Sequence, residues 1–127
     1  MPEISDAAIV SALGRQLNNA VAKQTAAASN LANLDTPGYR THDVSFDDAL
    51  DSELGSVRRT NASHLTAAPS DGASVEVTGL ASRRDGNNVQ LDRELLALSR
   101  AGGEFSRAQT ALTAKFRLVR YAINEGR

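Results

Sequence analysis

Two heptad patterns of apolar residues, one near each end of the chain, constrain the fold more than any other feature. In the first, spacings of three and four alternate from Val10 to Leu34, with Gln24 as the polar member. This period is typical of one face of a helix that packs on another helix. The positions are Val10, Leu13, Leu17, Ala20, Gln24, Ala27, Leu31 and Leu34. A long N-terminal helix is therefore predicted, and Pro37 ends it, because proline disfavours a helical conformation of the residue before it.

The second pattern follows the Asp-Gly-Asn-Asn turn signal at residues 85–88, with Asp92 as the predicted helix cap. Its positions are Leu91, Leu95, Leu98, Gly102, Phe105, Gln109, Leu112, Phe116, Val119 and Ile123. Each of the two glycines at 102 and 103 costs a helix about 1 kcal/mol relative to alanine, which leaves the continuity of this helix open. At about 1.5 Å per residue, both predicted helices are too long for a compact globule of 127 residues. An elongated shape is expected.

The predicted fold is all-α: an elongated, antiparallel, coiled-coil-like pairing of the N- and C-terminal helices, with a largely irregular, mobile middle segment. Residues 1–40 hold the first helix and a turn, 41–90 the middle segment and 91–127 the second helix; the two helices form one structural unit. Placing Gln24 opposite Gln109 also places Val10 opposite Ile123. A buried glutamine pair would specify this register. Alternatively, both glutamines lie at the edge of the seam with their amides in water.

The middle of the chain has the composition of an irregular segment. Residues 51–90 contain only seven large aliphatic side chains among many Ser, Thr, Asn, Asp, Gly and Ala. Such a segment buries too little apolar surface to offset its ordering entropy, so mobility is expected. Residues 74–78 alternate like a short strand, but no partner strand is evident. Residues 44–54 predict at most a weak, short helix.

Composition argues against several functional classes. The chain has no cysteine, which excludes disulfides and thiolate metal sites. Fourteen basic and fifteen acidic residues give a net charge of −1, with no global attraction to nucleic acid. No apolar stretch approaches the roughly 20 residues of a membrane span, and the acidic N-terminus lacks the features of a secretory signal.

Chemistry-bearing motifs are not evident either. His42 and His64 lie in polar segments, and neither has the spacing of a zinc site. Phosphate-binding loops and nucleophile elbows are missing from the sequence. We therefore expect no catalytic, metal or cofactor site, no small-molecule substrate and no nucleic-acid partner.

One motif is highly specific. The segment Ala32-Asn33-Leu34-Asp35-Thr36-Pro37-Gly38-Tyr39-Arg40 predicts a tight turn, with Pro37 at its second position and Gly38 at its third with positive φ. It resembles the turn that ends the first helix of bacterial flagellar rod and hook proteins. Residues 85–94 and 115–127 are similar to rod members of the family, and the short length resembles its proximal rod members. The matching turn residues are Ala32, Asn33, Thr36, Pro37, Gly38 and Tyr39.

The resemblance implies a structural subunit of the flagellar basal body rod, exported without a cleaved signal by the flagellar type III export apparatus. It implies self-assembly through the terminal helices into a periplasm-spanning drive shaft between the inner-membrane ring and the distal rod and hook. Other rod subunits, the inner-membrane ring and the export gate are the expected partners. The expected assembly seam comprises Leu13, Leu17, Gln24, Leu31, Leu34, Leu98, Phe105, Gln109, Leu112, Phe116, Val119 and Ile123.

By the same resemblance, the turn residues set the exit angle of the first helix and pack on a neighbouring subunit. Intramolecular packing of Tyr39 on the end of its own helix is the alternative. Two other functions stay open: a free cytoplasmic helical adaptor or chaperone, and an enzyme with an unrecognised Asp/His site. The enzyme would need a pocket that so few large apolar residues can hardly enclose.

Overall fold

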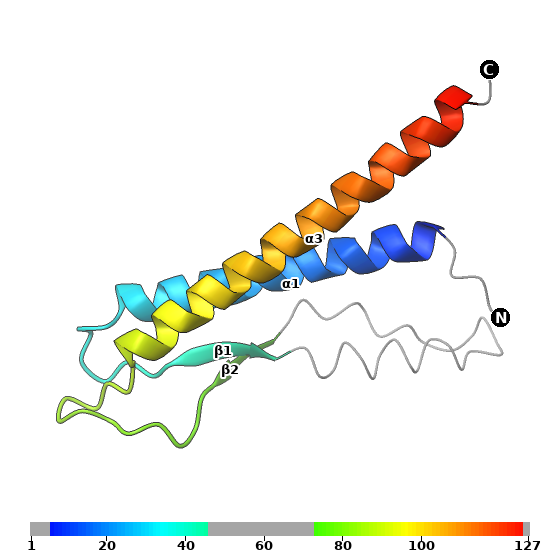
Figure 1. Ribbon diagram of the computed structural model, residues 1–127. Helices are drawn as coiled ribbons and strands as arrows, with labels where there is room; N and C mark the ends of the chain where they lie inside the picture. The colour runs from blue at the N-terminus through cyan, green and yellow to red at the C-terminus, as the bar shows by residue number, and fades with distance from the viewer. Residues whose placement is uncertain (1–5, 46–72, 126–127) are drawn as a thin grey trace, which may run out of the picture.

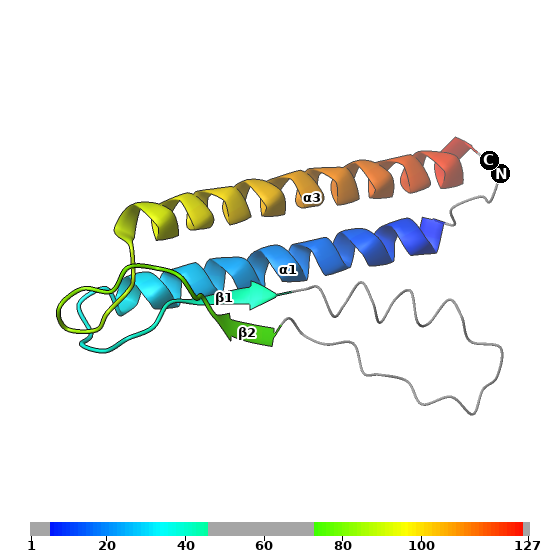
Figure 2. The ribbon, with the colours of Figure 1, turned by 90° about the horizontal axis from the view of Figure 1, so that it is seen from below.

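Two long helices packed side by side dominate the computed structural model, which describes residues 6–45 and 73–125 (Figure 1). Helix α1 covers Asp6–Ala32 and helix α3 covers Leu91–Glu125, and they run in opposite directions (Figure 2). Between them in sequence come two short strands, β1 (His42–Ser45) and β2 (Ala73–Glu76). The predicted pairing of the terminal helices in a mainly helical fold is confirmed.

Small side chains form the most closely packed part of the helix pair. Ala20 and Ala27 of α1 and Ala101 and Ala108 of α3 are each at most 3% exposed. The buried stripe of α3 is therefore shifted by one residue from the predicted heptad at alternate positions, because Gln109, next to Ala108, is exposed. Alanine favours this choice, since its short side chain lets two helix backbones approach closely while keeping a high helix propensity.

The predicted register is wrong by one heptad. Gln24 lies beside Gly102, where an added Cβ would be 3.5 Å from Gln24 Nε2, whereas Gln109 is exposed seven residues further along α3. The predicted partner of Val10, Ile123, is 69% exposed. A heptad pattern matches itself after a shift of seven residues, so periodicity alone cannot choose between these registers.

Polar contacts along the helix pair show the register that is adopted. Lys23 Nζ lies 3.0 Å from Glu104 Oε2 near the middle of the pair. At the other end, Lys115 Nζ lies 2.5 Å from Asp6 Oδ1. Because Asp6 is the first described residue of α1, the last ten residues of α3, 116–125, extend past it and are called the overhang below (Figure 1).

Helix α3 runs without interruption through both glycines, which answers the question of its continuity. Its predicted cap, Asp92, is wrong by two residues. The carbonyl of Gln90 accepts the first intrahelical hydrogen bond, from the Glu94 amide at 3.1 Å, so Gln90 holds the cap position. Asp92 lies in the first turn, where a negative charge interacts favourably with the helix dipole.

The strands pair antiparallel, with His42 opposite Glu76 and Ser45 opposite Ala73. The expectation that the strand near residue 74 lacks a partner is therefore wrong. Its partner, β1, is too short to show an alternating pattern in sequence. The first two residues of the predicted short helix, 44 and 45, belong to β1, and residues 46–54 lie outside the described part. So do residues 51–72 of the segment expected to be mobile, whereas residues 87–89 are buried.

Within the described residues, neither helix combines the length and apolarity needed to cross a membrane.

Candidate functional site

The predicted turn forms directly after α1. The Tyr39 amide donates to the Thr36 carbonyl at 3.3 Å, which places Pro37 second and Gly38 third in the turn. Gly38 has a φ of 71°, as predicted for the third position of a turn that only glycine adopts readily. The turn reverses the chain, so that β1 returns along α1 (Figure 2).

A side chain from the segment before α3 caps the end of α1. Asn87 Nδ2 lies 2.9 Å from the Asn33 carbonyl oxygen, 3.1 Å from that of Leu34 and 2.8 Å from that of Thr36. A helix leaves its last carbonyls without partners, and here a fully buried amide more than fifty residues away supplies the donors. The Asn87 side-chain oxygen in turn accepts from the Val89 amide at 2.8 Å, which holds the amide group in place.

Backbone groups join the same two segments. The Gly38 amide donates to the Asp85 carbonyl at 2.9 Å, and the Asn88 amide donates to the Tyr39 carbonyl at 3.3 Å. Asn88 Oδ1 accepts from the amide and the hydroxyl of Thr41, at 2.6 and 3.0 Å. We call the joined segments, residues 30–43 and 83–94, the clasp. Both sequence motifs that resemble rod proteins, at 32–40 and 85–94, lie within it and bind each other.

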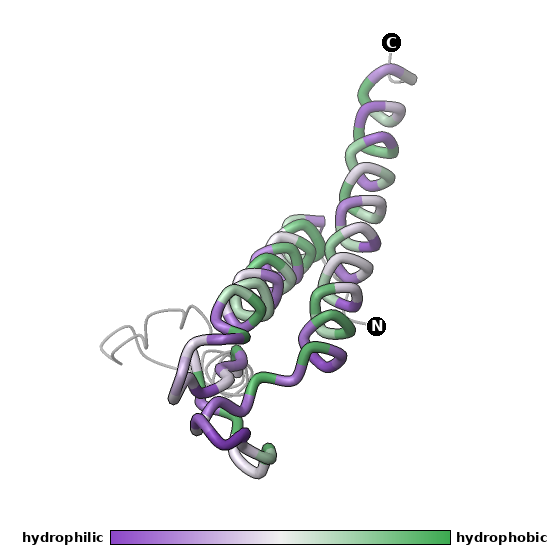
Figure 3. The backbone as a smooth tube through the Cα atoms, turned by 90° about the vertical axis from the view of Figure 1, so that its left-hand side faces the viewer, coloured by the Kyte–Doolittle hydropathy of each residue, from purple (hydrophilic) through white to green (hydrophobic). Residues whose placement is uncertain are grey.

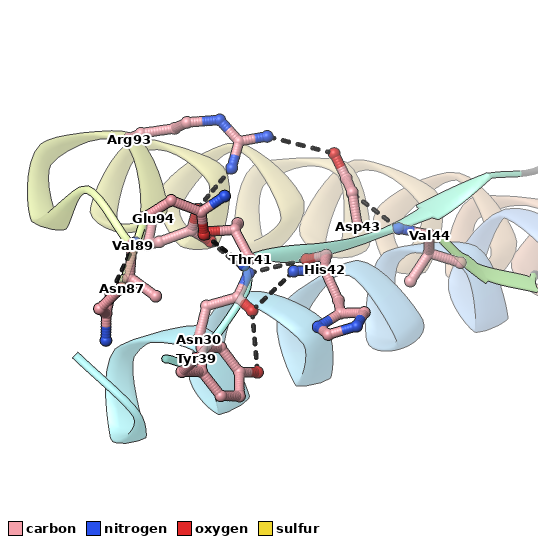
Figure 4. Close-up of polar contacts among 11 residues, drawn as sticks. Asn30, Tyr39, Thr41, His42, Asp43, Val44, Asn87, Val89, Arg93 and Glu94 are labelled. Carbon is pink, nitrogen blue, oxygen red and sulfur yellow. Dashed lines mark hydrogen bonds and ion pairs between the residues drawn. The ribbon is translucent and has the colours of Figure 1, made fainter. Parts of the chain in front are cut away.

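Asn30, near the end of α1, connects the clasp to α3 (Figure 4). Its Nδ2 donates to the His42 carbonyl at 2.7 Å and to Glu94 Oε2 at 2.9 Å. Its Oδ1 accepts from the His42 amide at 3.1 Å and from the Tyr39 hydroxyl at 3.2 Å. Four partners satisfy the hydrogen-bonding capacity of a side chain that is 1% exposed.

Glu94 carries the buried charge of the clasp. Its side chain is 2% exposed, and Oε1 accepts a charge-assisted hydrogen bond from Arg93 at 2.6 Å. Arg93 also lies 3.6 Å from Asp43 Oδ2, so this arginine bridges β1 and α3 (Figure 4). Removing one member would leave an uncompensated buried charge, which is strongly destabilising.

The chemistry of the clasp is that of a structural lock. Every buried side-chain nitrogen or oxygen in the described ranges has a hydrogen-bond partner. In those same ranges, no three His, Cys, Asp or Glu side chains gather as metal ligands would. The contacts fix two chain reversals and the ends of two helices relative to each other.

The residues of the predicted turn motif come together as one unit. Ala32 ends α1, and the Asn33 side chain donates to the Ser29 carbonyl at 2.9 Å and accepts from the Thr36 hydroxyl at 3.1 Å. Tyr39 is half-buried against its own chain, with its ring centroid 5.9 Å from that of His42. In the single chain, this contact is the intramolecular alternative for Tyr39.

The predicted seam residues divide into two groups. Those half-buried in the helix pair or just after α1 are Leu13, Leu17, Gln24, Leu31, Leu34, Leu98, Phe105 and Leu112. Those left exposed on α3 are Gln109, Phe116, Val119 and Ile123. The single chain therefore uses part of the seam internally and leaves the C-terminal part uncovered.

Sequence reasoning missed the residues that make the clasp specific. Asn30, Thr41, Asn87, Asn88 and Glu94 are all buried, although each is polar. The only available signal was the position of two of them inside the Asp-Gly-Asn-Asn turn motif. A turn explains glycine and asparagine locally, so the motif did not indicate that Asn87 reaches another helix.

Comparison with known proteins agrees with both motifs. A family model described as "Flagella basal body rod protein" matches residues 10–40, which cover most of α1 and the turn. The chain is also 32% identical over 116 residues to the flagellar basal body rod protein FlgB of Bacillus subtilis (strain 168). That alignment covers 80% of this chain and 90% of the relative, and so includes both helices and the clasp. The chain therefore belongs to the flagellar basal body rod protein family.

Proposed function

We propose that this protein, a structural subunit of the flagellar basal body rod, joins its neighbours through the overhang of α3 and the exposed part of the predicted seam. In this proposal the clasp keeps α1 and α3 in a fixed relation, so that the helix pair transmits torque as one stiff element. The proximal part of the rod is the proposed place of assembly, between the inner-membrane ring and export gate on one side and the distal rod on the other. Export through the flagellar type III apparatus belongs to the same proposal.

The observation that carries this proposal is the exposed apolar surface of the overhang. Phe116, Leu118, Tyr121 and Ile123 are 56–69% exposed, and Val119 is 39% exposed. Figure 3 shows apolar positions continuing along α3 to its free end, where α1 no longer covers them. Contiguous exposed apolar surface of this kind marks an interaction site in a soluble protein.

The apolar residues of the overhang lie on two sides of the helix. At about 100° per residue, Phe116, Val119 and Ile123 share one face, whereas Leu118 and Tyr121 lie on the opposite side. A symmetric dimer would cover one such face and leave the other in water. Two apolar faces favour enclosure between two neighbours, as expected within the wall of a continuous assembly.

The test places a charge on the overhang. We expect Phe116→Glu and Ile123→Glu to abolish motility and rod incorporation in cells whose only copy of the protein is the variant, because a carboxylate would be buried at a subunit contact. The helix content of the purified variants should stay unchanged, since both side chains are exposed in the single chain. Asn124→Glu is the matched control, because it adds the same charge to the polar arc of the same helix.

Normal motility of Phe116→Glu and Ile123→Glu would refute assembly through the overhang. If Asn124→Glu were equally defective, the effect would come from added charge on the helix and not from the apolar faces.

A further inference from the structure

A groove of about 320 Å³ opens between α1, β1 and α3 beside the clasp. Small side chains, among them Ala27 and Ala101, leave room at its base, and the half-exposed Leu96 adds an apolar wall. The carboxylates of Asp43 and Glu104 line it as well, with side chains that are 59% and 34% exposed.

The groove suits an aromatic side chain that carries a polar tip and has positive charges beside it. Alanine and leucine methyl groups would contact the ring, and the two partly exposed carboxylates would attract neighbouring cations. Among the described residues, the exposed aromatic side chains are Phe116 and Tyr121, both in the overhang. Of these two, only Tyr121 has a hydroxyl and is flanked by Arg120.

We propose that the groove of one subunit receives the overhang of a second copy of this chain, with Tyr121 as the inserted side chain. Arg117 and Arg120 then lie near Asp43 and Glu104 of the receiving copy. This inference rests on the proposed function, since it names the partner of the overhang.

The occupant must come from another molecule. Leu96 and Tyr121 lie on the same continuous helix, twenty-five residues apart, which at about 1.5 Å per residue separates them by about 37 Å. The overhang therefore cannot reach the groove of its own chain. A contact between different patches on the two partners is heterologous, and such contacts propagate into open helical assemblies unless the rotation closes a ring. That geometry agrees with a rod.

Single cysteines test the contact cleanly, because the native chain has none. Ala97→Cys places a thiol in the groove, and Ala122→Cys places one beside Tyr121 without removing the ring. Each variant is oxidised alone and as an equal mixture. We expect the mixture to form a 97–122 disulfide dimer at least about tenfold faster than either variant forms its own dimer, because a disulfide needs Cα atoms within about 7 Å.

Matched controls separate docking from collision. A mixture of Ala97→Cys with Thr110→Cys, an exposed position on α3 outside the overhang, should give only the slow rate. Adding Tyr121→Ala to the Ala122→Cys variant should lower the yield of the 97–122 disulfide about tenfold, as for a buried aromatic anchor, while Tyr121→Phe should lower it less.

Equal rates for the test and control mixtures, or a faster dimer of Ala122→Cys with itself, would overturn the assignment of the groove. If Phe116→Glu still blocked rod incorporation in that case, the proposed function would stand and only the docking site would be wrong.

Discussion

Replacing Asn87 with alanine tests whether the clasp holds the helix pair together. The two N–H groups of Asn87 serve three carbonyl oxygens at 2.8–3.1 Å, and the side chain is fully buried. Two lost hydrogen bonds account for about 2 kcal/mol, and carbonyls left without a donor add up to about 2 kcal/mol more. We expect Asn87→Ala to lower the free energy of unfolding by about 2–4 kcal/mol, a large share of the 5–15 kcal/mol typical of a domain.

The measurement is urea denaturation of the full chain followed by helical circular dichroism, together with hydrogen exchange of the amides at residues 33–41. Asn124→Ala is the matched control, because Asn124 is exposed on α3 and its loss should change stability by less than about 0.5 kcal/mol. Asn87→Asp keeps the shape but removes both donors, so it should destabilise at least as much as alanine. A loss below about 1 kcal/mol in Asn87→Ala, with unchanged exchange at 33–41, would refute the capping role.

Three further substitutions test other parts of the structure. Gly102→Ala should raise the free energy of unfolding by about 1 kcal/mol, because the added Cβ makes only an ordinary contact with Gln24, and a lower melting temperature would contradict this. Gly38→Val should cost about 1–3 kcal/mol and impair rod incorporation, since its φ of 71° strains a β-branched residue although its surroundings are open; unchanged stability and incorporation would argue against the turn assignment. Asp6→Asn should change stability by less than about 1 kcal/mol in urea denaturation, because its ion pair with Lys115 lies at the surface, and a larger loss would show that this pair anchors the helix ends.

Local signals in the sequence were sufficient for the helices and the turn. The apolar period located both helices, and the proline and glycine of the turn have backbone preferences that act without distant partners. The register needed more, because heptads that differ by one repeat fit the same partner face. Which heptad of α3 meets Gln24 depends on tertiary contacts such as Lys23 with Glu104, and these leave no periodic trace.

The clasp was the least predictable part, although both of its segments had attracted attention. Asn87 bonds to main-chain carbonyls, so no complementary side chain in the first segment indicates its partner. Asn30 and Glu94 interrupt otherwise apolar surroundings, and a buried polar pair is seen only when both helices are placed together. Strand β1 likewise depends on β2 and on Asn30, not on its own four residues.

The bonding pattern of Asn87 also implies an unequal tolerance of mutation on the two sides of the clasp. Its three acceptors belong to the peptide backbone, which stays the same whichever side chains occupy positions 33, 34 and 36. On the other side, the geometry needs an amide of one length, because glutamine would overreach and aspartate would present oxygens to oxygens. Drift at the end of α1 can therefore proceed without loss of the cap, whereas position 87 has almost no neutral alternatives.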